Sequence, residues 1–425
     1  MKKLTALAIL LLSLTTQAGM ANSTNAYTIL DTVYSRFTLP TNTQIKTAFE
    51  TCYSFNVPVT NKSARAELEK WMVSLQGPFS QVSEAIKTGY FKFPQIDLHN
   101  MSTTQLSGFR QIGRCEVAKA RLAIEAKDYQ GAGITFLETI QMGQLIAGGS
   151  GGLIHYLVGV AVQGMGIKGI ISMATNSNVP TETLQFLLKQ LPEAPEQDAA
   201  LVDAFSGERE LAVGQSLDDI QQFVLSPTNG SPVKLGTNVF DRGATIAMLN
   251  SVWGRMAANT TNSWLGRDQT MEHDLQRVTG CKSDFTEGFF WDYALCFNDT
   301  NKQAKCWAKV VKKARNMPNI LGKQYVSIMN MGNSPLEKSV KCRTEQNIIR
   351  TVLAITLYKR QTGKFPESLD ELIGSGILTQ IPLDLFSNKP LLYSKEKGIV
   401  WSVGPDGRNN KGHKDKDIVI SFLAR

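Results

Sequence analysis

The sequence predicts a mainly α fold: an irregular helical array followed by a small α+β domain, made of a helix and a three-stranded antiparallel sheet. Three observations support this prediction. From about residue 26 to 335 apolar residues recur mostly at helical spacing, and strands do not alternate with helices. After about residue 340 a helix is followed by three short β-rich runs that turn residues separate. We therefore expect an all-helical domain over 26–335 and a second domain over 338–425.

The first residues have the pattern of a secretory signal peptide. Two lysines precede an apolar run over 4–14, and small residues follow that allow cleavage after Ala18 or Ala21. The apolar run is too short to span a bilayer, and no cysteine follows it that could carry a lipid anchor. We therefore assign 1–21 to the signal peptide and expect an exported protein, periplasmic or extracellular.

Charge and cysteine content restrict the partners. The net charge is +8, two of which belong to signal-peptide lysines, and the remainder is too diffuse to indicate nucleic acid binding. Six cysteines in an exported chain can form disulfides. A local bridge from Cys281 to Cys296 or Cys306 is expected, because one helix over 292–314 would hold the latter two about 15 Å apart. Zinc is the alternative, but no CxxC pair supports it.

The segment 153–174, after a GGSGG turn, is almost free of charge and has two interpretations. It can span a membrane, or it can lie at the centre of a helical domain, where its glycines let neighbouring helices approach. His155 and Lys168 inside the segment favour the buried helix. Two earlier helices are predicted to join near Asp128 and Tyr129. Further helices are predicted at 181–192, 198–224, 240–264, 267–278 and 292–314, with a subdividing loop at 226–238.

Motifs spread over the tail, 338–425, resemble those of one known family. They include a helix that ends in a Y…G-x-F-P-x-x-L pattern over 358–369, then "PLDLFSNKPLLY" and "WSVGPDG…DKDI". In order and spacing they are similar to the globular domain of the major pseudopilin of type II secretion systems. The whole chain also resembles a group of exported bacterial proteins that join a long helical N-terminal part to such a tail.

The resemblance does not extend to the pseudopilin stalk. In that family the domain sits on a membrane-embedded N-terminal helix that polymerises. Here the helix before the tail carries polar and charged residues that are incompatible with lipid or a pilus core: Lys341, Arg343, Glu345, Gln346 and Asn347. The resemblance therefore implies a pseudopilin head without its stalk.

The resemblance also implies a metal site. The family's corresponding loop binds calcium through aspartates and backbone carbonyls, and the matching positions are Ser402, Val403, Asp406, Asp415 and Asp417. Calcium takes typically about six to eight oxygen ligands, which a glycine-rich loop can supply. The charge count argues the other way, because three aspartates stand among four lysines and arginines. The alternative is a loop whose aspartates cap turns and pair with lysines.

The GGSGG turn formally matches the G-x-S-x-G motif of hydrolases, with Ser150 as the nucleophile. Such an elbow needs a strand before the serine and a helix after it, whereas the preceding sequence has helical periodicity. His155 lies inside the apolar helix and would be an unusual base, and His413 is the other histidine in the required chain order. A flexible turn between two helices is the preferred interpretation.

Together these patterns predict an exported, non-enzymatic protein that binds or scaffolds a protein partner, linked to type II secretion. Calcium is the only cofactor the sequence indicates, and neither nucleic acid binding nor a stable membrane span is expected in the mature chain. Two alternatives stay open: a serine hydrolase that uses Ser150, and a membrane-associated protein held by 153–174.

Overall fold

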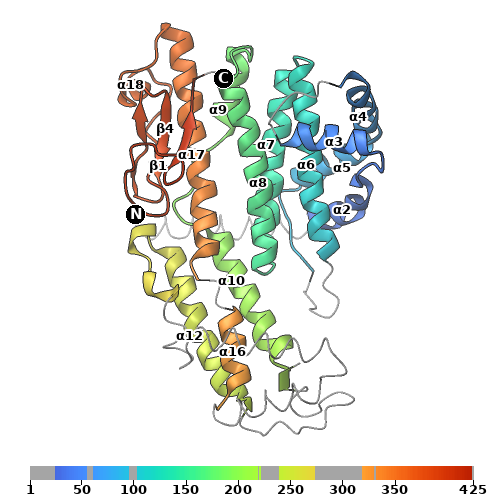
Figure 1. Cartoon of the computed structure of the whole chain (residues 1–425), viewed down its shortest axis with the longest axis vertical. Helices are drawn as coiled ribbons and strands as arrows, with labels where there is room; N and C mark the ends of the chain where they lie inside the picture. Colours follow the sequence, from blue (N-terminus) through green and yellow to red (C-terminus); the bar gives the residue numbers. More distant parts are fainter. Residues whose placement is uncertain are drawn as a thin grey trace, which may run out of the picture.

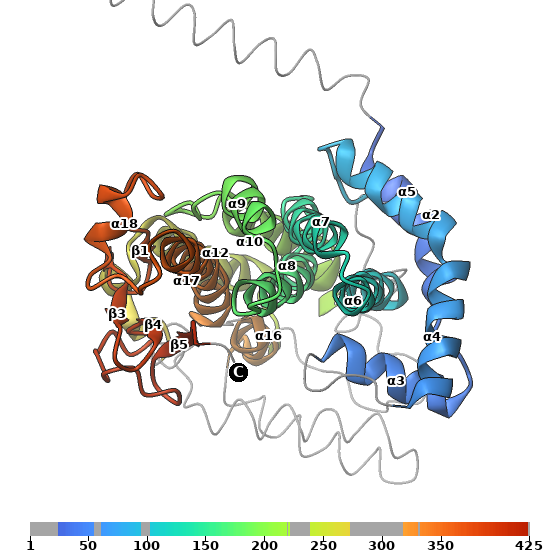
Figure 2. The same ribbon diagram turned by 90° about the horizontal axis from the view of Figure 1, so that it is seen from above.

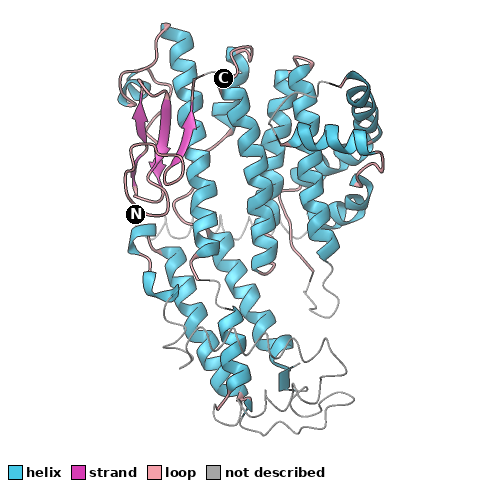
Figure 3. Ribbon diagram, in the orientation of Figure 1, coloured by secondary structure: helices cyan, strands magenta, loops and turns pink. Residues whose placement is uncertain are grey.

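The computed structural model of this chain describes residues 24–54, 61–94, 103–218, 220–221, 239–272, 318–329 and 332–423. Helices dominate these residues, and the C-terminal end adds a small three-stranded antiparallel sheet (Figure 3). The predicted fold class is therefore confirmed. The predictions for the loop at 226–238, the helix at 292–314 and the bridge from Cys281 lie outside the described residues. Cys52, Cys115 and Cys342 are buried free thiols.

The described helices follow one another along the chain. The first half contains α2 (Ala26–Val33), η2 (Tyr34–Phe37), α3 (Thr43–Tyr53), α4 (Lys62–Ser74), α5 (Gln76–Lys87), α6 (Thr103–Glu125), α7 (Tyr129–Ala147) and α8 (Leu153–Ala174). The second half contains α9 (Thr181–Gln190), α10 (Ala199–Leu211), η3 (Ala212–Ser216), α12 (Arg242–Thr261), η5 (Trp264–Gly266), η6 (Gln269–Glu272), α16 (Ile320–Met329), α17 (Ser334–Thr362) and α18 (Asp370–Gly374).

Most predicted boundaries agree with these elements. Helix α7 begins at Tyr129, and the Asp128 side chain caps it by accepting a 2.9 Å hydrogen bond from the Gly131 N–H. The helix predicted at 198–224 is helical over its described residues after the Asp198 cap: α10 passes into the π-helical turn η3, and residues 217–218 and 220–221 are again α-helical. The helix predicted at 267–278 is replaced, over its described part, by the 3₁₀ turn η6.

Seen from above, the helices form a row of layers (Figure 2). The sheet covers one side of α17, then come α8 and α9, then α7 and α6, and α2 to α5 form an outer layer at the far end. Helices α10, α12 and α16 form the lower part of the molecule (Figure 1). Helix α17 therefore lies between the sheet and the rest of the helical array.

Helix α8 is the helix of the described residues that is long and apolar enough to cross a membrane. Half of its apolar window is buried inside the protein, as in the core helix of a soluble protein. It packs closely on α7 because both helices carry glycine at their contact. A Cβ on Gly159 would lie 2.4 Å from the Ala147 backbone nitrogen and 2.6 Å from the Gly143 carbonyl oxygen.

One hydrophobic core joins the tail to the helical array across α17. Its fully buried members come from α6 to α9, α17, α18 and the sheet, and include Ile170, Leu184, Val352, Leu372 and Val400. Burial of side chains of this size contributes typically about 1.5–3 kcal/mol each. The stretch 348–357 of α17 is mostly apolar and buried on nearly every side because it is covered from two directions.

The sheet has the three strands that the sequence predicts, in the order β3 (Leu392–Ser394), β4 (Ile399–Ser402) and β5 (Ile418–Ser421), all antiparallel. A two-residue pair that the sequence did not indicate, β1 (Leu383–Asp384) with β2 (Lys389–Pro390), precedes it. Strand β4 is buried along its whole length, whereas β3 and β5 at the edges are half-buried. The loop between β4 and β5 holds the aspartates that the sequence singled out.

The contact between α7 and α8 can be tested with two glycines of the same helix. Gly159→Ala is expected to lower the free energy of unfolding by about 1–3 kcal/mol, because its methyl group meets backbone atoms that cannot move aside. Gly164→Ala meets open space and is expected to be neutral, or stabilising by about 0.5–1 kcal/mol. Urea unfolding followed by circular dichroism measures both, and equal effects would contradict the packing described.

Candidate functional site

Asp417 closes the loop between β4 and β5 through its own hydrogen bonds. One carboxylate oxygen accepts from the Gly412 N–H at 2.7 Å and the His413 N–H at 3.3 Å, and the other accepts from the Asn410 N–H at 3.2 Å. The side chain is almost fully buried. Lys411 and Gly412 both have positive φ, in the tight turn that carries these three donors, whereas the Lys411 N–H itself donates to the Asn409 side chain at 2.9 Å. Asp417 therefore acts as the internal anchor of this loop.

The other two aspartates do not converge on Asp417. Asp406 accepts from the Arg408 N–H at 2.9 Å and from the Asn410 side chain at 3.0 Å. The first of these bonds holds the pKa of Asp406 below its ordinary value. Asp415 is exposed and approaches only the His413 ring, at 3.8 Å. The loop therefore brings Asp406 and Asp417 to one asparagine and leaves Asp415 in solvent.

Ser402 and Val403 are held by a residue that the sequence analysis missed. Asp384, fully buried at the end of β1, accepts from the Ser402 hydroxyl at 2.7 Å and from the Val403 N–H at 3.1 Å. It also accepts from the Phe386 N–H at 3.0 Å and the Ser387 hydroxyl at 2.9 Å. One sequence feature could have identified Asp384: it stands between two leucines in "PLDLF", where an apolar residue is expected, and a buried aspartate needs hydrogen-bond partners.

The helical array also contacts this loop. The Trp264 indole donates a 2.9 Å hydrogen bond to the Pro405 carbonyl and packs edge-on against Phe386, with ring centroids 5.1 Å apart. The Arg267 guanidinium lies 3.5 Å from the centroid of the same indole. One backbone carbonyl of the loop is thus occupied by a side chain from the turn after α12. The position of the loop depends on the helical array as well as on the sheet.

This geometry fits the alternative of a self-capped loop better than it fits a cation. To offer both oxygens to calcium, Asp417 would have to release backbone N–H groups, and Asp415 would have to turn in from solvent. Across the described residues, no group of three or more His, Cys, Asp or Glu side chains is placed to hold a metal. Calcium binding at Ser402, Val403, Asp406, Asp415 and Asp417 stays a prediction.

The roles of Asp417 and Asp415 can be separated by mutation. Asp417→Ala is expected to cost about 1–3 kcal/mol of unfolding free energy, because it strips a buried acceptor from several N–H groups. Asp415→Ala, at an exposed position, should change it by less than about 0.5 kcal/mol. Thermal melts in EDTA and in millimolar calcium measure both effects. A calcium-dependent rise that Asp415→Ala abolishes would instead support the metal site.

Ser150 lies in the turn between α7 and α8. Its φ of 53° is in the left-handed region, and helix α7, not a strand, precedes it. The serine is exposed at the rim of a groove of about 660 Å³, which the segment 89–92 and one face of α7 line. The strand–serine–helix arrangement of a nucleophile elbow is therefore absent at this position.

His155 is the histidine nearest to this serine in sequence, and it is buried. Its ring packs against Phe93 with centroids 4.3 Å apart, and its Nδ1 has no hydrogen-bond partner among the described residues. Burial lowers its pKa to about 4. No hydrogen bond joins Ser150 to a histidine in the part of the chain that the structure describes. The residues proposed for a hydrolase are therefore not assembled into a nucleophile–base pair.

The burial of His155 predicts an acid-dependent loss of stability. Its folded pKa of about 4 lies below the unfolded value of roughly 6.5, so its contribution is present above pH 6.5 and is lost as pH falls toward 4. Between pH 6.5 and pH 4 the free energy of unfolding of the wild type should fall by about 2–3 kcal/mol more than that of His155→Gln. Urea unfolding at several pH values measures the difference. His413→Gln, at an exposed position, is the control, and an equal response of both variants would contradict the prediction.

A second concave site, which the sequence did not indicate, lies where α8, α10 and α17 meet. It is a cavity of about 310 Å³. Asp198, the N-cap of α10, lies at its polar end and accepts from the Leu201 N–H at 3.2 Å. Its other oxygen accepts from the hydroxyls of Tyr156 and Ser339, each at 2.5 Å. Burial is the main cause that raises the pKa of Tyr156, and the neighbouring Asp198 carboxylate raises it further. The phenol therefore keeps its proton.

Helix α17 supplies the other polar side chains of this cavity. Arg343 donates from Nη1 to the carbonyls of Pro195 and Glu196, at 2.7 and 2.8 Å. Gln346 donates to the Pro192 carbonyl at 2.9 Å. These bonds hold the irregular segment between α9 and α10 against α17. Arg343 and Gln346, two of the polar residues that argued against a pilus core in the sequence, therefore have partners inside this protein.

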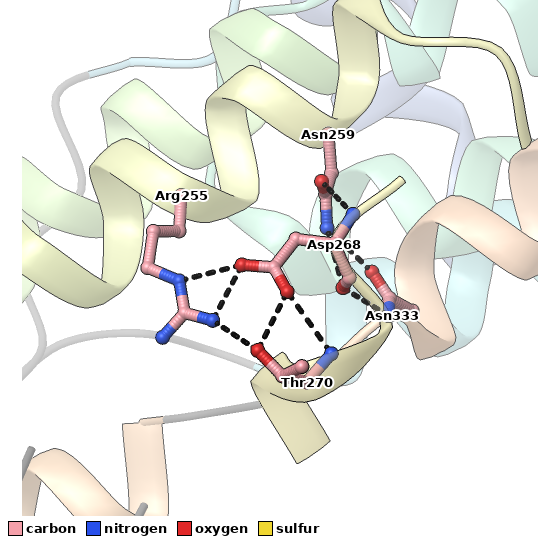
Figure 4. A network of polar contacts seen from close by, with 5 residues as sticks. All are labelled: Arg255, Asn259, Asp268, Thr270 and Asn333. Carbon is pink, nitrogen blue, oxygen red and sulfur yellow. Dashed lines mark hydrogen bonds and ion pairs between the residues drawn. The ribbon is translucent and has the colours of Figure 1, made fainter. Parts of the chain in front are cut away.

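A polar network fixes the start of α17 (Figure 4). Asn333, its N-cap residue, accepts a 2.9 Å hydrogen bond from the Asn259 side chain, whose oxygen in turn accepts from the Asp268 N–H at 2.8 Å. The Asp268 carboxylate pairs with Arg255 and Thr270, and these two partners hold its pKa below the ordinary value. The network ties α17 to α12.

No family model, no curated protein and no solved structure matches this chain.

Proposed function

We propose that this chain is an exported protein that binds or scaffolds a partner, with a pseudopilin-like head as its recognition surface and a component of type II secretion as its partner. One observation carries the proposal, the burial of α17 on two sides. The corresponding helix of pseudopilins polymerises. Here it lies under the sheet on one side and against α8 and α9 on the other.

Such a helix is not available as a filament stalk, and this supports a role for the head outside the filament. Breaking the bonds of Arg343, Gln346 and Asn347 to free α17 would leave buried donors and carbonyls unpaired, at about 1–3 kcal/mol for each group. The head is instead presented on a fixed body. Its outer part exposes single apolar side chains such as Ile373 and Leu423, which are 40% and 42% exposed.

A hydrolase remains the second candidate, and a specific observation favours testing it. Ser150 combines an exposed side chain, a left-handed backbone and a position on the rim of a groove. The lack of a hydrogen bond between Ser150 and His155 weighs against a hydrolase. The membrane-associated alternative has less support, since half of the apolar window of α8 is buried.

The proposal is tested by photo-crosslinking in a Gram-negative host that has a type II secretion system. A photoreactive amino acid replaces Ile373 on the head or, as the matched control, Val73 on α4, which is 61% exposed. The head position is expected to crosslink to a pseudopilin or another secretion component, identified by mass spectrometry, and the α4 position is not.

Two results would overturn the proposal. One is a crosslinking pattern in which neither position captures a secretion component. The other is hydrolysis of an ester substrate by the purified chain that Ser150→Ala abolishes, which would favour the hydrolase.

A further inference from the structure

The cavity between α8, α10 and α17 has the features of a binding site for a small molecule. Its polar wall is made of side chains that are almost completely buried: Tyr156 and Ser339 are 1% exposed, Gln346 is 4% exposed and Arg343 is 9% exposed. Small apolar residues line other parts of it, among them Ala147 and Ala200. A concave site with apolar walls and a few convergent polar groups is the usual construction of a ligand pocket, and its volume is at the small end of the range.

Arg343 has a donor in this cavity that the protein does not use. Both of its carbonyl partners accept from Nη1, and Nη2 makes no hydrogen bond to the described residues. Nε is also without a partner, but it is shut off from the cavity space and cannot meet a ligand. The nearest carboxylate oxygen, on Asp198, is 3.9 Å from Nε, which is beyond hydrogen-bonding distance. A buried guanidinium N–H without an acceptor is costly, so an oxygen from outside the chain is expected beside it.

Asp198 supplies the opposite charge at the same end of the cavity. Three donors, from Tyr156, Ser339 and Leu201, hold its carboxylate in one orientation, and a carboxylate can accept about four hydrogen bonds. One acceptor position is therefore left. The site offers one fixed positive group and one fixed negative group, a few ångströms apart.

We infer that this cavity binds a small zwitterion that carries both a carboxylate and an ammonium group, as a free amino acid does. A simple anion would pair with Arg343 but would meet the charge of Asp198, and a simple cation would have the reverse problem. A zwitterion satisfies both groups at once, and its small side chain lies against the alanines. This inference rests on the proposed binding function and names a ligand class for the helical body.

The test is a thermal-shift and calorimetric screen of the purified mature chain. The probes are the twenty L-amino acids, each tested alone, and every amino acid that raises the melting temperature is compared with its deaminated acid and its decarboxylated amine. At least one amino acid is expected to bind, with both analogues weaker by about tenfold or more, because each lacks one charged hydrogen bond.

Two pairs of variants locate the site. Arg343→Lys keeps the charge but loses the planar fork, and is expected to weaken binding about tenfold or more. Arg350→Gln is its control, because Arg350 also donates to backbone carbonyls from α17 but does not line the cavity. Ala200→Leu fills the cavity without touching the charged groups and should also weaken binding, whereas Ala161→Leu, at an exposed position on α8, should not.

The inference is overturned if no amino acid binds the folded wild type, which would mean that a water molecule serves Arg343. It is also overturned if the deaminated acid binds as tightly as the amino acid, or if Ala200→Leu leaves binding unchanged. Crosslinking of the head to a secretion component does not depend on any of these results, so the failure of one proposal can be told from the failure of the other.

Discussion

The structure depends on a helix that is covered from two sides. Over residues 348–357 α17 is buried almost all round, because Val352 and its neighbours contact the sheet as well as α8 and α9. Over its N-terminal half it carries Arg343, Gln346 and Asn347, whose burial is tolerated only because each has a backbone partner. The tail and the helical array therefore share their most buried element.

That shared helix explains several local features. The segment between α9 and α10 has no regular structure of its own, yet side chains of α17 bond to the carbonyls of Pro192, Pro195 and Glu196. Those bonds set the position of Asp198 and so create the polar end of the cavity. On the opposite side, Asn347 donates to the Leu383 carbonyl, next to the Asp384 anchor of the head. Both candidate sites are therefore positioned by the same helix.

In the aspartate loop the protein's own donors bind the carboxylates. Asp417 is buried and satisfied by N–H groups of its own loop, and the indole of Trp264 takes the Pro405 carbonyl. The charges of Arg408 and Lys416 add to the hydrogen bonds that keep the pKa of Asp406 below its ordinary value. Hydrogen-bond donors of the loop, and the contact of the helical array with it, offset the repulsion between the neighbouring carboxylates.

The sequence by itself determined the fold class, most helix boundaries and the three strands. Those features follow from local patterns such as the cap at Asp128 and the periods of the apolar residues. It also located α8 as a buried helix, since charge and glycine content are visible without a structure. Only the tertiary structure decided that Asp384 anchors Ser402, that His155 does not pair with Ser150, and that Arg343 and Asp198 face one cavity. These contacts depend on residues that are far apart in the chain, so local sequence patterns could not predict them.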